Sequence, residues 1–212
     1  MSVEREQDVK DETRVREMVP AGRSVRAWAV LAVVVVAGLV IDLASKNLAF
    51  ERVAAFPVVV DRQAVLSTDR LDMLIPVHEP VVVVPSVLEF TLVLNPGAVF
   101  GVGAGKRWFF VAFTVLALGF AMWIFSCWTR ERDRLAHVSI GLIVAGGLGN
   151  LYDRLVYACV RDFIHPLPGH SLPFGISWPG GNRDLWPYVS NVADLYLIVG
   201  IVVLLVLNWK KG

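Results

Sequence analysis

The sequence predicts an all-α membrane protein, built as a bundle of four transmembrane helices. Hydrophobic residues make up 56% of its 212 residues, and the mean hydropathy is +0.60. Both values are too high for an ordinary soluble domain. Charged residues make up only 18%, and they leave long runs nearly uncharged, as membrane-spanning helices are. A net charge of +1 gives no reason to expect nucleic acid as a partner.

The first 22 residues mix acidic and basic side chains with few large apolar ones. A segment of this composition buries too little surface to offset the entropy lost when it orders. We therefore expect residues 1–22 to form a disordered cytoplasmic tail, and residues 23–212 to form the membrane domain.

The first transmembrane helix is predicted at residues 27–50, directly after Arg23 and Arg26. Its start is similar to a secretory signal peptide, but the later spans favour a polytopic protein. Asp42 and Lys46 interrupt its far end, and because they are four residues apart they share one helix face and can pair. The simpler alternative is that the two charges only end the helix, with Lys46 reaching back to the membrane surface.

Residues 51–106 are predicted to be an extracytoplasmic insertion, because its prolines exclude a long helix. Runs rich in β-branched and other apolar residues predict short strands at 58–60, 81–84 and 88–94. The last strand leads into the turn Asn95–Gly101, where small residues let the backbone approach closely.

The remaining spans are predicted at residues 108–128, 135–158 and 188–209. Gly141, Ala145 and Gly149 recur every four residues along the third span. This stripe of small residues permits close contact with a neighbouring helix. Residues 165–187 are rich in proline, glycine and aromatic residues, and we expect them to form an outside loop on the membrane surface.

The short loops and tails set the orientation of the bundle. One side of the membrane carries most of their basic residues: Arg23, Arg26, Arg130, Arg132, Arg134, Lys210 and Lys211. The positive-inside rule makes this side cytoplasmic, so both termini are expected in the cytoplasm.

Polar residues from three spans are predicted to reach the same depth near the outer face. Asp153 lies about 27 Å along the third helix, near its outer end, and Asp194 lies about 9 Å into the fourth from its outer start. The residues expected to converge at this depth are Asp42, Asn150, Asp153, Asp162, Asn191 and Asp194.

This polar set supports two kinds of chemistry. Two carboxylates in one site do not both ionise readily, so one keeps its proton. Such a pair can activate water and protonate a leaving amine, which fits an aspartyl hydrolase. The same carboxylates could instead serve a small proton- or cation-coupled membrane transporter, although transporters usually show internal repeats and midplane sites.

Other chemistries find less support in the sequence. The spans contain no serine with a nearby histidine, and no spacing of cysteine or histidine is typical of a metal site. Cys127 and Cys159 are expected near opposite faces of the bilayer, too far apart to form a disulfide.

Five short motifs follow one another in the order of a known family. They are Asp42–Lys46, Asn95–Gly101, Gly146–Arg154, Asp162–Ile164 and Asn191–Asp194. With them the chain resembles lipoprotein signal peptidase, that is, signal peptidase II. The resemblance covers about residues 27–50 and 88–209, so the tail and most of residues 51–87 lie outside it.

The resemblance implies an intramembrane aspartic endopeptidase of the bacterial cytoplasmic (inner) membrane, acting at the outer leaflet without metal or cofactor. It would remove the signal peptide from prolipoproteins, cutting before a cysteine that already carries diacylglycerol. It also implies a small extracytoplasmic β-sheet cradle, contact with membrane lipid and sensitivity to globomycin-type inhibitors. We expect a monomer.

The family's motifs also assign roles to residues. The catalytic pair maps to Asp162 and Asp194. The supporting or substrate-binding positions are Asp42, Lys46, Asn95, Gly97, Asn150, Asp153, Arg154, Asn191 and Ala193. Arg154, beside Asp153, is expected to form a structural ion pair with it rather than to take part in catalysis.

Three positions depart from the family's usual residues. Leu43 replaces a glutamine, which removes a polar contact, and Ser190 replaces a phenylalanine, which is expected to loosen the start of the fourth helix. Arg161 replaces an apolar residue, and if it faces the catalytic pair it would favour ionised Asp162. A non-catalytic homologue that only binds lipidated peptides is a further alternative, opposed by the presence of both aspartates.

Overall fold

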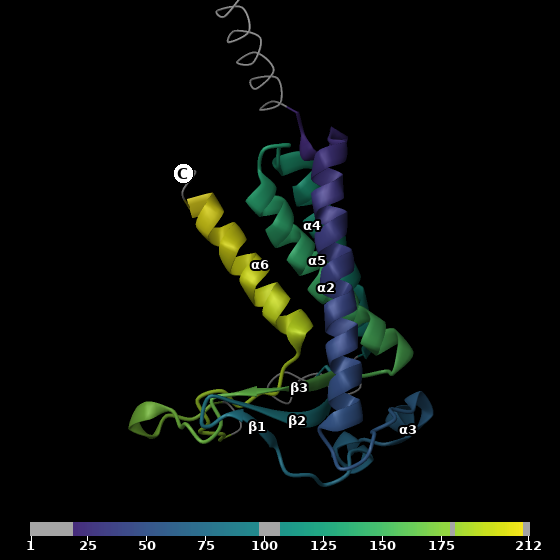
Figure 1. Ribbon diagram of the computed structural model, residues 1–212, viewed down its shortest axis with the longest axis vertical. Coiled ribbons are helices and arrows are strands. Elements are labelled where there is room, and N and C mark those ends of the chain that lie inside the picture. The colour runs from purple at the N-terminus through teal and green to yellow at the C-terminus, as the bar shows by residue number, and fades with distance from the viewer. Residues whose placement is uncertain (1–18, 98–106, 179–180, 210–212) are drawn as a thin grey trace, which may run out of the picture.

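The computed structural model describes residues 19–97, 107–178 and 181–209. Within them, four helices are long and apolar enough to cross a membrane: α2 (Val25–Arg52), α4 (Arg107–Trp128), α5 (Arg134–Val156) and α6 (Val192–Trp209). The prediction of four spans is therefore confirmed. The helices run alternately up and down, and a small sheet lies across one end of the bundle (Figure 1). Both ends of the described chain lie at the opposite end (Figure 1).

Two helix ends fall short of their predicted bounds. α5 stops at Val156, two residues early, because Ala158 has a left-handed φ of 65° that a helix cannot contain. α6 begins at Val192 instead of residue 188. Ser190 is extended there, and its N–H donates to the carbonyl of Ile164 at 2.8 Å.

The end of the expected tail is structured. Residues 1–18 lie outside the described part of the chain, but Ala21–Arg23 form the 3₁₀ helix η1. Pro20 forms a β-bridge with Arg130, and the buried Ala21 donates its N–H to the carbonyl of Thr129 at 2.9 Å. The prediction of disorder is thus wrong for residues 19–22, because the loop between α4 and α5 supplies partners for their backbone.

The helix α5 forms the centre of the bundle, in contact with α2, α4 and α6. Its small residues make these contacts close, since a Cβ at Gly141 would lie 2.8 Å from Val34 of α2. Gly146 faces the backbone carbonyl of Ala193 in α6 in the same way. The predicted role of the small-residue stripe in helix packing is confirmed.

A three-stranded antiparallel sheet covers one end of the bundle, in the order β1 (Val81–Val84), β2 (Leu88–Asn95), β3 (Val160–Pro166). The strands predicted at 81–84 and 88–94 are confirmed. The strand predicted at 58–60 is wrong, since these residues have no strand partner. The insertion also contains the short helix α3 (Arg62–Ser67) and the 3₁₀ helix η2 (Leu71–Leu74), and η3 (Pro173–Gly175) follows the sheet.

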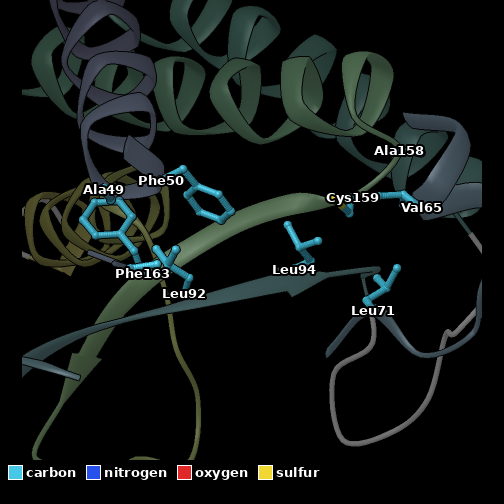
Figure 2. Packing of buried hydrophobic residues seen from close by; sticks show 10 residues of the cluster. Ala49, Phe50, Val65, Leu71, Leu92, Leu94, Ala158, Cys159 and Phe163 are labelled. Atoms are coloured by element: carbon cyan, nitrogen blue, oxygen red, sulfur yellow. The ribbon is translucent and has the colours of Figure 1, made fainter. Parts of the chain in front are cut away.

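An apolar core joins the sheet to the bundle and to the insertion (Figure 2). It contains residues from the end of α2, the insertion, β2 and the start of β3: Ala49, Phe50, Ala54, Val65, Leu71, Leu92, Leu94, Ala158, Cys159 and Phe163. Figure 2 shows Phe50 and Phe163 above β2, with Leu71 of the insertion on the other side of that strand. The insertion is therefore part of the core that supports β3.

Candidate active site

The predicted polar residues do come together, at the end of the bundle that carries the sheet. α2 supplies Asp42 and Lys46, α5 supplies Asn150 and Asp153, β3 supplies Asp162, and the start of α6 supplies Asp194. A continuous network of hydrogen bonds and ion pairs links them.

Asp42 and Lys46 form a fully buried ion pair, with Lys46 Nζ 2.9 Å from Asp42 Oδ2. This confirms the predicted pairing along one helix face. Asp42 Oδ1 also accepts the backbone N–H of Ala193 at 2.8 Å, so its charge lies at the N-terminus of α6, where the helix dipole favours an anion. Gly149 leaves room for this carboxylate, since a Cβ there would collide with Asp42 Oδ2.

Asp153 is fully buried and binds two cations. Lys46 Nζ lies 3.4 Å from its Oδ2, and the guanidinium of Arg161 lies 2.9 Å from its Oδ1. The backbone N–H of Arg161 donates to it as well, at 3.0 Å. The expected ion pair with Arg154 is wrong, because adjacent residues of a helix point in different directions.

Arg161 turns away from the predicted catalytic pair. Successive side chains of a strand point to opposite faces, so Arg161 reaches Asp153 while Asp162 faces the other way. Its Nη1 also donates to Asn47 Oδ1 at 2.6 Å, and its guanidinium stacks on Tyr157 at 4.3 Å. The suggestion that Arg161 faces Asp162 is therefore wrong.

Arg154 is half-buried at the end of α5. It donates to the backbone carbonyl of Asn150 at 3.2 Å and lies over the ring of Phe110 at 5.6 Å. Its charge interacts most strongly with Asp194, then with Asp162 and Asp153, so it is a cation close to this pair.

Asn150 connects the buried ion pairs to Asp194. Its Oδ1 accepts from Lys46 at 3.1 Å and from Asn191 Nδ2 at 3.2 Å, and its Nδ2 donates to Asp194 Oδ1 at 2.8 Å. Because two donors occupy the oxygen, the amide orientation is fixed, and only its N–H₂ can face Asp194.

Both oxygens of Asp162 accept hydrogen bonds from amides. Asn95 Nδ2 donates to Oδ2 at 3.0 Å, and Asn191 Nδ2 donates to Oδ1 at 2.5 Å. Asn95 is in turn held by the N–H of Gly97 at 2.8 Å. Gly97 has a φ of 97°, and a Cβ there would collide with Phe110. Residues 98–101 of this predicted turn lie outside the described residues.

Asp194 is positioned by a capping box. Its N–H donates to Asn191 Oδ1 at 3.0 Å, while the N–H of Asn191 donates to Asp194 Oδ2 at 3.2 Å. This reciprocal pair begins α6 and leaves Asp194 partly exposed, whereas Asp162 is only 1% exposed.

Ser190 fastens the start of α6 to β3. Its carbonyl accepts the N–H groups of Phe163 and Ile164 at 2.9 and 2.8 Å, so the two chain segments that carry Asp162 and Asp194 are joined directly. Leu43, the other substituted position, is half-buried on α2.

Asp162 and Asp194 differ in their electrostatics from Asp42 and Asp153, which pair with cations. Burial, followed by the negative charge of Asp194, raises the pKa of Asp162 to about 7, against the lowering effect of its two amide donors. The pair therefore retains a proton near neutral pH.

Within the described residues, no group of three histidine, cysteine, aspartate or glutamate side chains is arranged to hold a metal ion. Cys127 and Cys159 are not joined to each other.

Sequence reasoning missed two parts of this site. Asn47 and Arg161 complete the surroundings of Asp153, and residues 160–166 were not predicted to form a strand. The spacing of eight residues between Asp153 and Arg161 follows no local rule, because it depends on the left-handed corner at Ala158.

Comparison with known families gives one clear match. A family model described as signal peptidase (SPase) II matches residues 34–210. Lipoprotein signal peptidase of Desulfitobacterium hafniense (strain DSM 10664 / DCB-2) is 34% identical over 132 residues, covering 62% of this chain and 75% of the relative. The protein of the same name from Streptococcus pyogenes serotype M1 is 34% identical over 130 residues, covering 60% and 73%.

Solved structures show a similar fold. Two structures, each described as a bacterial membrane enzyme, match with a TM-score of 0.59 and 23% and 22% sequence identity. The first match covers 85% of this chain and 88% of the solved one, and the second covers 86% and 94%.

Proposed function

This chain belongs to the signal peptidase II family, and from that premise we propose that Asp162 and Asp194 are its catalytic pair. The enzyme is a peptidase that removes the signal peptide from prolipoproteins. We further propose that it cuts before the diacylglyceryl-modified cysteine. This relationship favours the peptidase over the transporter alternative.

One observation supports the assignment of the pair most strongly. Asp162 and Asp194 interact electrostatically, yet their hydrogen-bond donors are neutral amides of Asn95, Asn150 and Asn191. The raised pKa of Asp162, about 7, is that of a carboxyl group able to act as an acid at neutral pH.

The proposed reaction uses one protonated and one ionised carboxyl group. Asp194 accepts a proton from a water molecule as the water oxygen attacks the scissile carbonyl carbon, while Asp162 donates its proton to the carbonyl oxygen. The tetrahedral intermediate then collapses, the C–N bond breaks, and the pair protonates the leaving amine. The cation of Arg154 stabilises the negative charge that the pair carries.

The supporting residues hold this geometry. Lys46 and Asp153 fix Asn150, which aims its amide at Asp194, and Asp42 anchors the N-terminus of α6 through Ala193. In this account these residues do not exchange protons with the substrate, because their charges are already paired.

We also propose a membrane orientation. The basic residues of the short loops favour a cytoplasmic location for the end of the bundle that carries both chain ends. The sheet and the catalytic pair are then at the outer leaflet of the bacterial cytoplasmic membrane. A lipid-modified substrate can reach this position from the bilayer between the helices.

A cleavage assay tests the proposed function. Purified enzyme in bilayers is mixed with a synthetic diacylglyceryl prolipoprotein, and the products are analysed by mass spectrometry. We expect a cut directly before the modified cysteine, and inhibition by globomycin. We also expect that the unmodified peptide is not cut, and that the active enzyme is a monomer. A cut at another bond, or equal cleavage without the diacylglyceryl group, would contradict the proposal.

A further inference from the structure

A cleft runs along the edge of β2 that faces away from β3. Its volume is about 320 Å³. Residues of the insertion, among them Ile75 and His78, form one wall, and Leu92, Val93 and Leu94 of β2 form the other. The lining is mainly apolar, and none of the residues that line the cleft contributes a side chain to the site described above.

This edge of β2 lacks a neighbouring strand. β1 pairs only with Leu88–Phe90, so among the described strands the rest of β2 pairs on its β3 side alone. The N–H of Leu92 points into the cleft, where it donates to His78 Nε2 at 3.3 Å. Since alternate residues of a strand direct their backbone groups to the same edge, the N–H and C=O of Leu94 face the cleft as well.

His78 is a weak partner for this edge. Its Nδ1 donates to the carbonyl of Glu79 at 3.1 Å, which leaves the lone pair of Nε2 for the N–H of Leu92. The 3.3 Å separation is at the long end of the hydrogen-bond range. A peptide carbonyl can therefore replace the imidazole at little cost.

The cleft is close to the catalytic pair. Val93 lies opposite Asp162 in the sheet, and Asn95 donates to Asp162. Neighbouring strands are about 4.8 Å apart, so a peptide added at this edge lies roughly 10 Å from β3, a distance that about three extended residues span. The sheet lies beyond the ends of α5 and α6 (Figure 1), on the side to which the substrate continues after the cleaved bond.

We propose that this cleft binds the extended segment that follows the modified cysteine of a prolipoprotein, as an added strand on β2. The proposal rests on the proposed function and names a subsite for the same substrate. Backbone hydrogen bonds to Leu92 and Leu94 hold the segment regardless of its sequence, and the apolar walls accept small or apolar side chains at alternate positions.

Two substrates of different length test the subsite. Both carry the same signal peptide and diacylglyceryl cysteine, but one ends a single residue after the cysteine and the other continues for about eight. We expect Ile75→Trp, which fills the cleft, to raise the KM of the long substrate about five-fold. A change of this size corresponds to the loss of one or two backbone hydrogen bonds. The short substrate cannot reach the cleft, so its kinetics stay unchanged. Met73→Trp is the matched control, because Met73 is 72% exposed on the same insertion outside the cleft.

A second variant tests the direction of the effect. His78→Ala frees the N–H of Leu92, so the KM of the long substrate should fall about two- to three-fold while that of the short substrate does not change. Equal effects of Ile75→Trp on both substrates, or no effect on either, would overturn the subsite. If the unmodified enzyme cleaves neither substrate, the proposed function fails, and the subsite with it.

Discussion

The polar network contains two pairs of aspartates in contrasting surroundings. Asp42 and Asp153 are fully buried and bind the cations of Lys46 and Arg161. Asp162 and Asp194 are held by neutral amides, with Arg154 as a nearby cation that makes no ion pair with them. The difference shows that buried carboxyl groups of one network can have partners of very different charge. A cation in contact with a buried carboxyl group favours its ionised form, whereas two carboxyl groups that share a site favour retention of a proton.

The two pairs also depend on each other. Lys46 contacts both of the cation-paired aspartates and Asn150, and Asn150 contacts Asp194. The first pair thus supports the second, which is the proposed catalytic pair. Substitutions around the first pair should therefore act mainly on stability, and substitutions in the second pair mainly on activity.

The largest expected effect comes from removing either reactive carboxyl group. Asp162→Asn and Asp194→Asn keep the size of the side chain but cannot transfer the proton, so each should lower kcat by about 10³-fold or more. The measurement is cleavage of a diacylglyceryl prolipoprotein by purified protein. A cooperative unfolding transition serves as the control that each variant is folded. Activity near the wild-type level in either variant would refute the assignment of the pair.

Removing the shared cation should act first on stability. Lys46→Met leaves the buried charges of Asp42 and Asp153 with Arg161 as their remaining cation, and the free energy of unfolding should fall by about 3–5 kcal/mol. Denaturation in mixed micelles measures the loss. Lys46→Arg is the comparison, since it keeps the charge, and it should lose less. A Met variant as stable as the wild type would show that these aspartates are not ionised together.

The pH dependence separates the two pairs. The pKa of Asp162 is raised to about 7, and the protonated form is the active one, so kcat/KM should fall about ten-fold per unit as pH rises above 7. A raised pKa in the folded state means that Asp162 contributes stability below about pH 4, and that this contribution is lost as pH rises to about 7. The stability difference between wild type and Asp162→Asn should vary across that range. Activity that is flat from pH 6 to pH 9 would contradict the account.

The smallest effect on chemistry is expected at Arg161. Its side chain binds Asp153 and Asn47 on the face of β3 opposite to Asp162. Arg161→Val should therefore lower the free energy of unfolding by about 1–3 kcal/mol and leave the midpoint of the pH–rate profile unchanged. A shift of that midpoint would show that Arg161 acts on the reactive pair after all.

Much of this molecule follows from local rules that the sequence displays. The four spans follow from their apolar runs, and the ion pair of Asp42 with Lys46 follows from their spacing on one helix. The strand β3 does not, because Arg161 and Asp162 interrupt its apolar pattern and its pairing with β2 is set by distant residues. The predicted partner of Asp153, Arg154, is wrong for a similar reason. The chain reverses at Ala158 and brings Arg161 back to Asp153 instead.

Above all, we predict that the amide-held pair of Asp162 and Asp194 keeps one proton at neutral pH. Infrared difference spectroscopy across a pH titration measures this directly, through the carbonyl stretch of protonated carboxyl groups. We predict one such band that disappears with a midpoint near pH 7 and is absent in Asp162→Asn. A band that survives in Asp162→Asn, or the absence of any such band at pH 6, would contradict the claim.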